Sequence, residues 1–333
     1  MPLALLALTI SAFAIGTTEF VIVGLIPTIG ADLGVSLPSA GLLVSLYALS
    51  VAIGAPLLTA LTGRVPRKAL LAGLMALFTV GNLVAWQAPG YESLIVALFG
   101  LVAFLGAVAF VPRGLPQTPP APLARQLRVL AQPRLLLVYA MTAVGYGGSL
   151  IAFTYMAPLL EQIAGFTPSQ VSLVLVGYGV SVAVGNVWGG KLADAVGPVK
   201  ALKRIFLLLA IVLLALTFTI HVKWLAVLTM LAWGAVAFGN VPGLQVYVVK
   251  QARHFAPDAT DVASGFNIAA FNLGVAGGSS LGGLIVANVG LGHTPWIAAV
   301  VTLGAFALTA LSGRLDRRHG LPERTAEPVE LAH

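Results

Sequence analysis

Long apolar segments alternate with short polar segments along almost the whole chain. Ten segments are apolar enough to be membrane spans: 4–28, 41–61, 69–88, 92–111, 135–159, 170–190, 203–222, 224–249, 263–289 and 294–312. Each approaches the roughly 20 apolar residues with which an α-helix crosses a bilayer. The pattern therefore predicts an all-α polytopic membrane protein with about ten transmembrane helices.

The composition agrees with this fold class and excludes several kinds of site. Charged residues make up 9% of the 333 residues, whereas a soluble domain has about 25%. The chain has no cysteine, which excludes disulfides, thiol catalysis and thiolate metal ligands. Its five histidines are scattered through loops and tail, so we expect no metal site.

The distribution of the basic residues predicts the topology. If the N-terminus is cytoplasmic, every Lys and Arg except Lys223 falls in a cytoplasmic loop or in the tail. Such asymmetry is the positive-inside rule, and it places both termini in the cytoplasm. The net charge of +7 is thereby explained without a nucleic-acid partner.

The first part of the chain repeats in the second part at an offset of 131 residues. Identical residues coincide at Gly16 and Gly147, Pro27 and Pro158, Gly34 and Gly165, Tyr47 and Tyr178, and Gly54 and Gly185. The offset changes after Ala97, because residues 98–113 match the end of the second part near residue 314. About 70 residues, enough for two spans with their loops, therefore have no counterpart in the first half.

The repeat predicts two transmembrane halves of unequal length. Residues 1–112 form a shortened N-terminal half with four spans, and residues 113–134 form a cytoplasmic linker rich in Pro and Arg. Residues 135–312 form a C-terminal half with six spans, followed by a cytoplasmic tail over 313–333.

Four segments carry a resemblance to a known family. They are TTEFVIVGLIPTIGADLGVS at 17–36, YESLIVA at Tyr91–Ala97, GFNIAAFNLGVAGGSSLGGL at Gly265–Leu284, and a loop pattern of Gly190, Lys191, Asp194, Gly197 and Lys200. With them the chain resembles the major facilitator superfamily, in its twelve-span drug:proton antiporter branch. It is most similar there to bacterial arabinose-efflux and purine-efflux permeases.

The resemblance implies a two-half helical bundle in the bacterial inner membrane. It implies efflux of a small molecule by alternating access, driven by the proton gradient and without a cofactor. The loop pattern of the second half would form the gate, whereas the first half keeps only its basic part, at Arg64, Arg67 and Lys68. The family's fourth and fifth spans, with an arginine tied to proton coupling and an antiporter glycine motif, have no clear counterpart here.

Glu19 lies near the middle of a predicted span, whereas the other acidic residues lie at the edges of spans or outside them. A charge at membrane depth costs roughly 2.5–3.5 kcal/mol on insertion scales, so such groups often serve a function. Glu19 is our candidate for the proton-coupling site. The alternative is a neutral, buried carboxylic acid hydrogen-bonded to Thr17, Thr18 or Tyr47.

Other polar and small residues inside the spans have two interpretations each. Tyr47, Tyr146, Asn240, Asn267 and Asn272 are candidates for lining a substrate path, or they join helices through hydrogen bonds and packing. Small residues recur every four positions at Gly274, Gly278 and Gly282, which predicts close helix packing. Ser181, Gly185 and Gly189 form a similar face, which we expect to be exposed because its partner span in the family is missing.

Three functions remain after this reading. The first is a proton-coupled efflux transporter for a drug, sugar or nucleoside. The second is a transport-defective deletion variant, and the third is a membrane scaffold or partner-binding protein. The sequence does not determine the oligomeric state. An enzyme is not expected, because the phosphate-loop spacing from Gly185 to Lys191 is followed by Leu192 where Ser or Thr is required.

Overall fold

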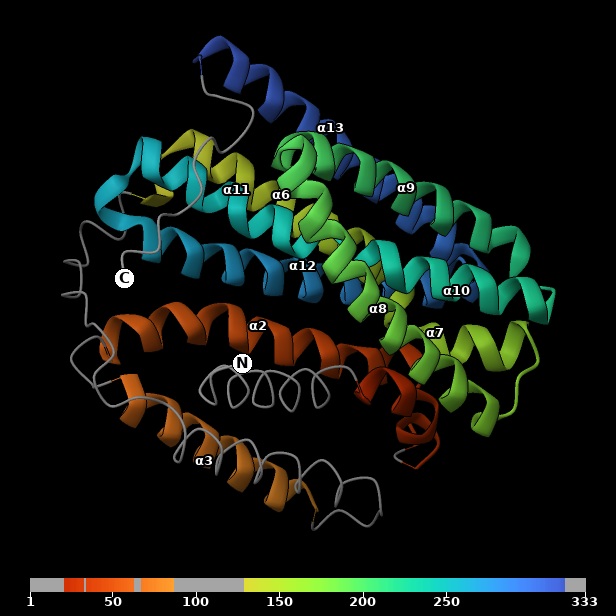
Figure 1. Ribbon diagram of the computed structural model, residues 1–333. Coiled ribbons are helices and arrows are strands. Elements are labelled where there is room, and N and C mark those ends of the chain that lie inside the picture. The colour runs from red at the N-terminus through yellow and green to blue at the C-terminus, as the bar shows by residue number, and fades with distance from the viewer. Residues whose placement is uncertain (1–20, 33, 63–66, 87–128, 321–333) are drawn as a thin grey trace. The chain divides into compact units, whose positions relative to one another are not determined.

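The structure is a computed structural model that describes residues 21–32, 34–62, 67–86 and 129–320. Across these ranges the secondary structure is helical and contains no strand (Figure 1), which confirms the all-α fold class. The chain divides into two compact units. One comprises Met1–Ile22 and Leu58–Pro120, and the other comprises Val23–Leu57 and Ala121–His333.

The larger unit contains six helical segments long and apolar enough to cross a membrane. They are α6 (Pro133–Phe153), α8 (Pro168–Val196), α9 (Pro198–Thr219), α10 (Lys223–Ala237) with α11 (Asn240–Phe255), α12 (Thr260–Asn288) and α13 (Thr294–Arg318). Each coincides with one of the six spans predicted between residues 135 and 312. Short helices complete this part: α7 (Met156–Pro158), η1 (Leu159–Ile163), η2 (Pro257–Ala259) and η3 (Leu291–His293).

The N-terminal part contributes three described helices. They are a helix over Val21–Asp32, α2 (Leu37–Thr62) and α3 (Arg67–Trp86). Both α2 and α3 coincide with predicted spans. The predicted span over 92–111 lies outside the described residues, and so does residues 4–20 of the first span.

The helix bounds carry the same repeat as the sequence. α2 begins at Leu37 and α8 at Pro168, which is 131 positions later. α3 begins at Arg67 and α9 at Pro198, again 131 positions later. The internal repeat is therefore a repeat of helices and not only of residue types.

The turn before α2 and the turn before α8 also share their geometry. Gly34 has φ 63° and Gly165 has φ 70°, a left-handed conformation that glycine adopts without strain. Two residues later a hydroxyl caps the helix. The Ser36 hydroxyl accepts from the Ser39 N–H at 3.3 Å, as the Thr167 hydroxyl accepts from the Gln170 N–H at 3.4 Å.

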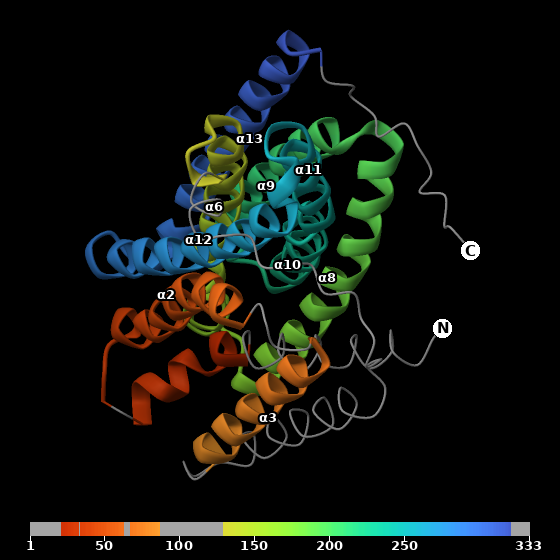
Figure 2. The ribbon, with the colours of Figure 1, turned by 90° about the vertical axis from the view of Figure 1, so that its left-hand side faces the viewer.

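The core of the C-terminal part lies around α6, which packs against both α12 and α13 (Figure 2). In its most apolar window 72% of the residues are buried, compared with 22% for α8. Its inward face, with Val138 and Met141, meets Phe206 of α9 and Val248 of α11. α6 is therefore the helix that positions polar side chains inside the bundle.

One transmembrane segment is interrupted near its middle. The helix ends at Ala237, and α11 restarts at Asn240 after Phe238 and Gly239. Interrupted helices place backbone and side-chain polar groups inside a bundle, and transporters use them around their binding sites.

Candidate functional site

Several predicted site residues lie outside the described part or at its margin. Glu19 and Arg64 are outside the described residues, while Arg67 and Lys68 are the first two residues of α3. Tyr47 lies on α2 and is 43% exposed. The roles assigned to these five residues stay predictions.

The predicted gating loop joins α8 to α9. Gly190, Lys191 and Asp194 lie on the last turns of α8, and Lys200 lies in the first turn of α9. Lys191, Asp194 and Lys200 are exposed. Gly197 separates the helices with φ 85°, a conformation that side-chain-bearing residues rarely adopt. Gly197 thus allows α9 to begin directly after α8.

Two of the predicted substrate-path amides form hydrogen bonds inside the bundle. The Asn267 Oδ1 on α12 accepts from the Thr142 hydroxyl on α6 at 2.7 Å. The Asn272 Nδ2 donates to the backbone oxygen of Ile268, one turn earlier, at 3.0 Å. Asn267 therefore joins two helices, while Asn272 keeps its side-chain oxygen without a partner among the described residues.

Asn240 differs from the other amides because neither polar atom of its side chain has a partner in the described structure. It is 1% exposed and is the first residue of α11, directly after the interruption of the span. An amide buried without hydrogen bonds costs about 1–3 kcal/mol. A buried amide with free donor and acceptor atoms is suited to bind a polar solute.

An aromatic cluster around Tyr146 is formed by residues that adjoin two of these amides in the sequence. The Tyr146 ring on α6 contacts Phe271 edge-on at 4.3 Å and Phe238 at 6.3 Å between ring centroids. Phe271 precedes Asn272 by one residue, and Phe238 precedes Asn240 by two. Four of the predicted substrate-path residues thus come from α6, α11 and α12 within one helix bundle, and Tyr146 is central to the arrangement.

The glycines of α12 allow it to approach the backbone of α6. A Cβ added to Gly274, Gly278 or Gly282 would overlap with backbone atoms of α6. In the other direction, a Cβ on Gly147 of α6 would lie 3.1 Å from the backbone oxygen of Gly274. Both helices are therefore held at a distance that only glycine permits.

The small-residue face of α8 is covered, so our expectation that it would be exposed is wrong. A Cβ on Gly185 or Gly189 would overlap with the backbone around Ala235 and Gly239, and Gly234 leaves room for the Ser181 hydroxyl. Glycine spacing indicates a close approach, but it does not identify the neighbour, which here is α10. The exposed stripe of α8 instead carries large apolar side chains: Leu173, Val176, Val180, Val184 and Val187.

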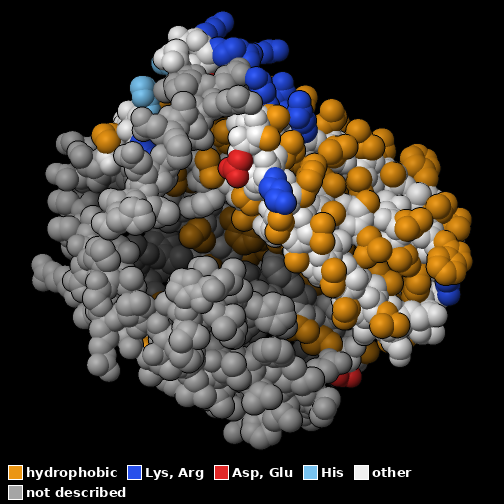
Figure 3. Space-filling model, in the orientation of Figure 1, with side chains coloured by type: hydrophobic (Ala, Val, Ile, Leu, Met, Phe, Trp, Pro, Cys, Tyr) orange, Lys and Arg blue, Asp and Glu red, His pale blue; other side chains and the backbone are white. Residues whose placement is uncertain are grey.

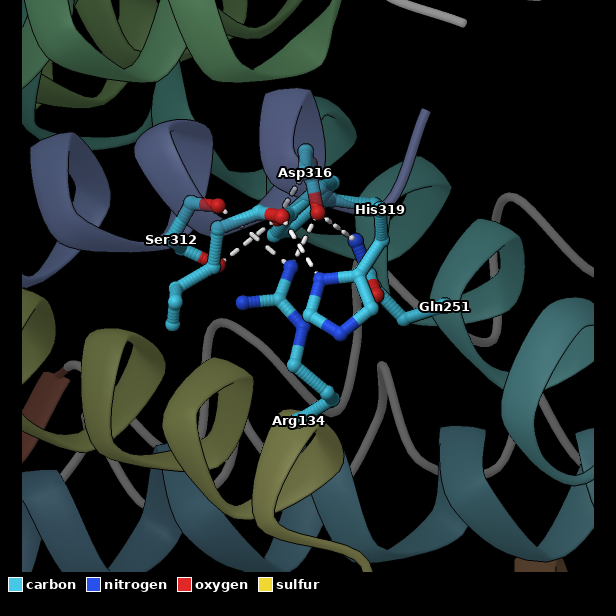
Figure 4. Close-up of polar contacts among 7 residues, drawn as sticks. Arg134, Gln251, Ser312, Asp316 and His319 are labelled. Atoms are coloured by element: carbon cyan, nitrogen blue, oxygen red, sulfur yellow. Dashed lines mark hydrogen bonds and ion pairs between the residues drawn. The ribbon is translucent and has the colours of Figure 1, made fainter. Parts of the chain in front are cut away.

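A polar network that the sequence did not predict joins α6, α11 and α13 (Figure 4). Asp316 of α13 forms an ion pair with Arg134 of α6. Its carboxylate also accepts from the Tyr247 hydroxyl and from the Gln251 Nε2, each at 2.8 Å. The Tyr247 hydroxyl lies 2.7 Å from the Ser312 hydroxyl. The Arg134 and Asp316 side chains are only 9% and 7% exposed.

This network was missed because hydropathy ends the last span at residue 312, whereas α13 continues to Arg318 and buries Asp316. A usable signal was present: Tyr247 and Gln251 are four residues apart, as are Ser312 and Asp316. Residues four apart share one helix face. Two such polar pairs at the ends of apolar helices would have indicated a buried contact.

No group of three or more His, Asp or Glu side chains is placed to hold a metal ion anywhere in the described ranges.

Comparison with known proteins gives consistent matches. Residues 8–114 and 86–260 match the Major Facilitator Superfamily. The chain is 39% identical to the "Uncharacterized MFS-type transporter YtbD" of Bacillus subtilis, covering 95% of this chain and 96% of that one. It is 34% identical to the "Inner membrane transport protein YdhP" of Escherichia coli, over 93% and 96% of the two chains. It is 25% identical to the "Probable sugar efflux transporter" of Helicobacter acinonychis, over 91% and 92%.

Among solved structures, the human organic anion transporter MFSD10 (TETRAN) matches with a TM-score of 0.65. The two chains are 17% identical, and the match covers 92% of this chain and 96% of the other. At this identity the match shows a shared fold.

The alignment to YtbD also bears on the length of the chain. The alignment runs over 382 positions, which is more than the 333 residues of this chain. The relative therefore has residues without a counterpart here. The two family matches overlap at residues 86–114, which include Ala97, where the repeat offset changes. Both observations agree with a chain that is shorter than its family.

Proposed function

The chain belongs to the Major Facilitator Superfamily, and from this membership we propose that it is a secondary active transporter that exports a small solute in exchange for protons. The proposed mechanism is alternating access, in which two halves expose a central site to each side of the membrane in turn. The proposed location is a bacterial inner membrane, which the name of the relative YdhP supports. The family and these relatives are transporters and not enzymes.

Asn240 is the observation that carries this proposal. A buried amide with no partner is costly in a membrane protein, because no bulk water reaches the hydrocarbon region. Asn240 follows the interruption between α10 and α11, and Phe238 within the interruption contacts the Tyr146 ring. Hydrogen-bonding groups beside aromatic rings suit a solute with hydroxyl or amide groups and an apolar face.

The direction and the solute class are proposed from a relative. Efflux is supported by the sugar efflux transporter among the relatives. The proposed solutes are therefore sugars first, with nucleosides and amphiphilic drugs as the other members of the class. Proton coupling is proposed for Glu19, and gating for the loop that contains Lys191 and Asp194.

The test is flux in proteoliposomes that contain the purified full-length chain. An imposed pH gradient should drive accumulation of a radiolabelled sugar, nucleoside or cationic drug, and a protonophore should abolish it. In Asn240→Leu we expect transport to fall at least tenfold while the unfolding temperature stays equal or rises, because the variant loses no hydrogen bond. Asn267→Leu is the matched control, since it removes the bond to Thr142 and should lower stability.

One specific observation favours a second candidate function. The chain lacks residues that its relatives have, so it is a candidate for a family member that inserts but does not transport. The same measurement decides between the two. If no solute of the three classes moves under a pH gradient, while the chain is folded and monodisperse, the transporter proposal is wrong.

A further inference from the structure

Two exposed helix stripes end in basic residues at the same end of the C-terminal bundle. On α13 the exposed positions Val300, Leu303 and Leu311 lead to Arg314 and Arg318 at helical spacing. Such a stripe is apolar along the membrane span and cationic over its last turn.

α9 carries a stripe of the same kind, but here the basic residue comes first in the sequence and the apolar residues follow. It begins with the exposed Arg204 and continues with Leu207, Leu208, Ile211 and Leu214, which are 41–54% exposed. α9 starts at the end of the bundle where α13 finishes, because the two helices pack antiparallel.

Direct contacts show that the two basic ends are neighbours. A Cβ on Gly313 of α13 would lie 2.7 Å from the Val199 Cγ1 at the start of α9. The Lys203 Nζ lies 5.8 Å from the centre of the Phe306 ring, so this ammonium group spans from α9 to α13. Figure 3 shows the result, a gathering of Lys and Arg side chains at one end of the C-terminal bundle above a largely apolar surface.

The acidic residue of this region does not neutralise the basic end. Within α9 and α13 the acidic side chain is Asp316, which is buried and already bound by Arg134, Tyr247 and Gln251. The exposed Asp194 precedes α9, but it lies on α8 together with Lys191. Lys203, Arg204, Arg314 and Arg318 therefore present a net positive surface.

We propose that this surface, which we call the α9–α13 basic end, binds an anionic phospholipid of the cytoplasmic leaflet. The phosphate contacts Arg204, Arg314 and Lys203, and the acyl chains lie along the apolar stripes of the two helices. A soluble anion or a nucleic acid would match the charges but not the apolar stripes that continue from them. Clusters of Lys and Arg directly cytoplasmic of a transmembrane helix attract anionic lipid at about fivefold per residue. The proposal does not depend on transport activity.

Basic residues at the cytoplasmic ends of spans also serve to orient a membrane protein. The test therefore needs a control variant at another basic residue that lies at the same membrane surface. Arg253 provides it: it is exposed, it lies in the last turn of α11, and it is outside the α9–α13 basic end. A general electrostatic attraction would weaken equally when Arg253 or Arg314 is neutralised.

The experiment measures lipid retained by the full-length chain in mixed micelles, by native mass spectrometry, as phosphatidylglycerol or phosphatidylcholine is titrated in. We expect saturable retention of phosphatidylglycerol, about 25-fold weaker in Arg204→Gln/Arg314→Gln and unchanged in Arg253→Gln. The single variants Arg204→Gln and Arg314→Gln, each about fivefold weaker, keep the test valid if the double variant is unstable.

Three outcomes would overturn the proposal. Equal retention of phosphatidylcholine would show that charge is not recognised. An equal loss of lipid retention in Arg253→Gln would show a general electrostatic attraction and not a specific binding site. Competition by inorganic phosphate at millimolar concentration would show a site for a free anion and not for a lipid.

Discussion

At the residue scale, the buried ion pair between Arg134 and Asp316 is the feature most removed from what hydropathy predicts. Basic residues near span ends indicate which side of the membrane a loop occupies, but not whether a side chain is buried. Arg134 counted among the cytoplasmic charges, and the structure places it inside the bundle. Burial of a charge requires a partner of opposite sign and further hydrogen bonds, and Asp316 has both.

We predict that Asp316→Asn destabilises the C-terminal half by about 3–5 kcal/mol, because it leaves the Arg134 charge buried without a counterion. Thermal unfolding of the detergent-solubilised protein, followed by tryptophan fluorescence, would measure the change. Asp194→Asn is the control, since Asp194 is an exposed acid of the same half and should be within about 0.5 kcal/mol of the parent. Arg134→Met combined with Asp316→Leu should recover part of the loss, and strict additivity of the two changes would contradict a coupled pair.

At the element scale, the repeat at offset 131 made the helix bounds predictable. Residue types indicated the equivalence, and the structure repeats it in the starts of α2 and α8 and of α3 and α9. The turn before each pair works in the same way because a left-handed glycine and a capping hydroxyl are local features of the sequence. Residues that are neighbours in space can be far apart in the sequence. For this reason the partner of the small-residue face of α8 was predicted wrongly.

Adjacent glycines of α12 offer a test of helix packing. We predict that Gly278→Ala destabilises the bundle by about 1–3 kcal/mol, because its Cβ would overlap with the Gly147 backbone and push α6 away. Gly277→Ala is the matched control: a Cβ there meets nothing within 4 Å, and alanine is the better helix former by about 0.5–1 kcal/mol. If the two variants had equal unfolding temperatures, α6 and α12 would be able to move apart without loss of stability.

At the scale of the whole molecule, the described residues after 129 hold six apolar segments, and the alignment to YtbD contains residues that have no counterpart in this chain. Six apolar segments form the C-terminal bundle, and α6, α11, α12 and α13 each bring buried polar side chains into it. Alternating access needs a second half that closes against the first, and the sequence predicts only four spans for the N-terminal half. The remaining candidate for proton coupling in the N-terminal half is Glu19. The equivalent residue of the second half, 131 positions later, is the apolar Leu150.

We predict that Glu19→Gln abolishes transport driven by a pH gradient but preserves exchange of labelled for unlabelled solute across the membrane. The amide keeps the size and hydrogen-bonding capacity of a neutral carboxylic acid, yet it cannot release a proton, so only the coupled step is lost. Asp32→Asn, an exposed acid at the end of the helix over Val21–Asp32, should leave both activities at the level of the parent. Gradient-driven flux that persists in Glu19→Gln would mean that this carboxyl is structural. Loss of both activities would assign Glu19 to the binding or movement of the solute and not to the proton, because exchange requires a complete access cycle without net proton transfer.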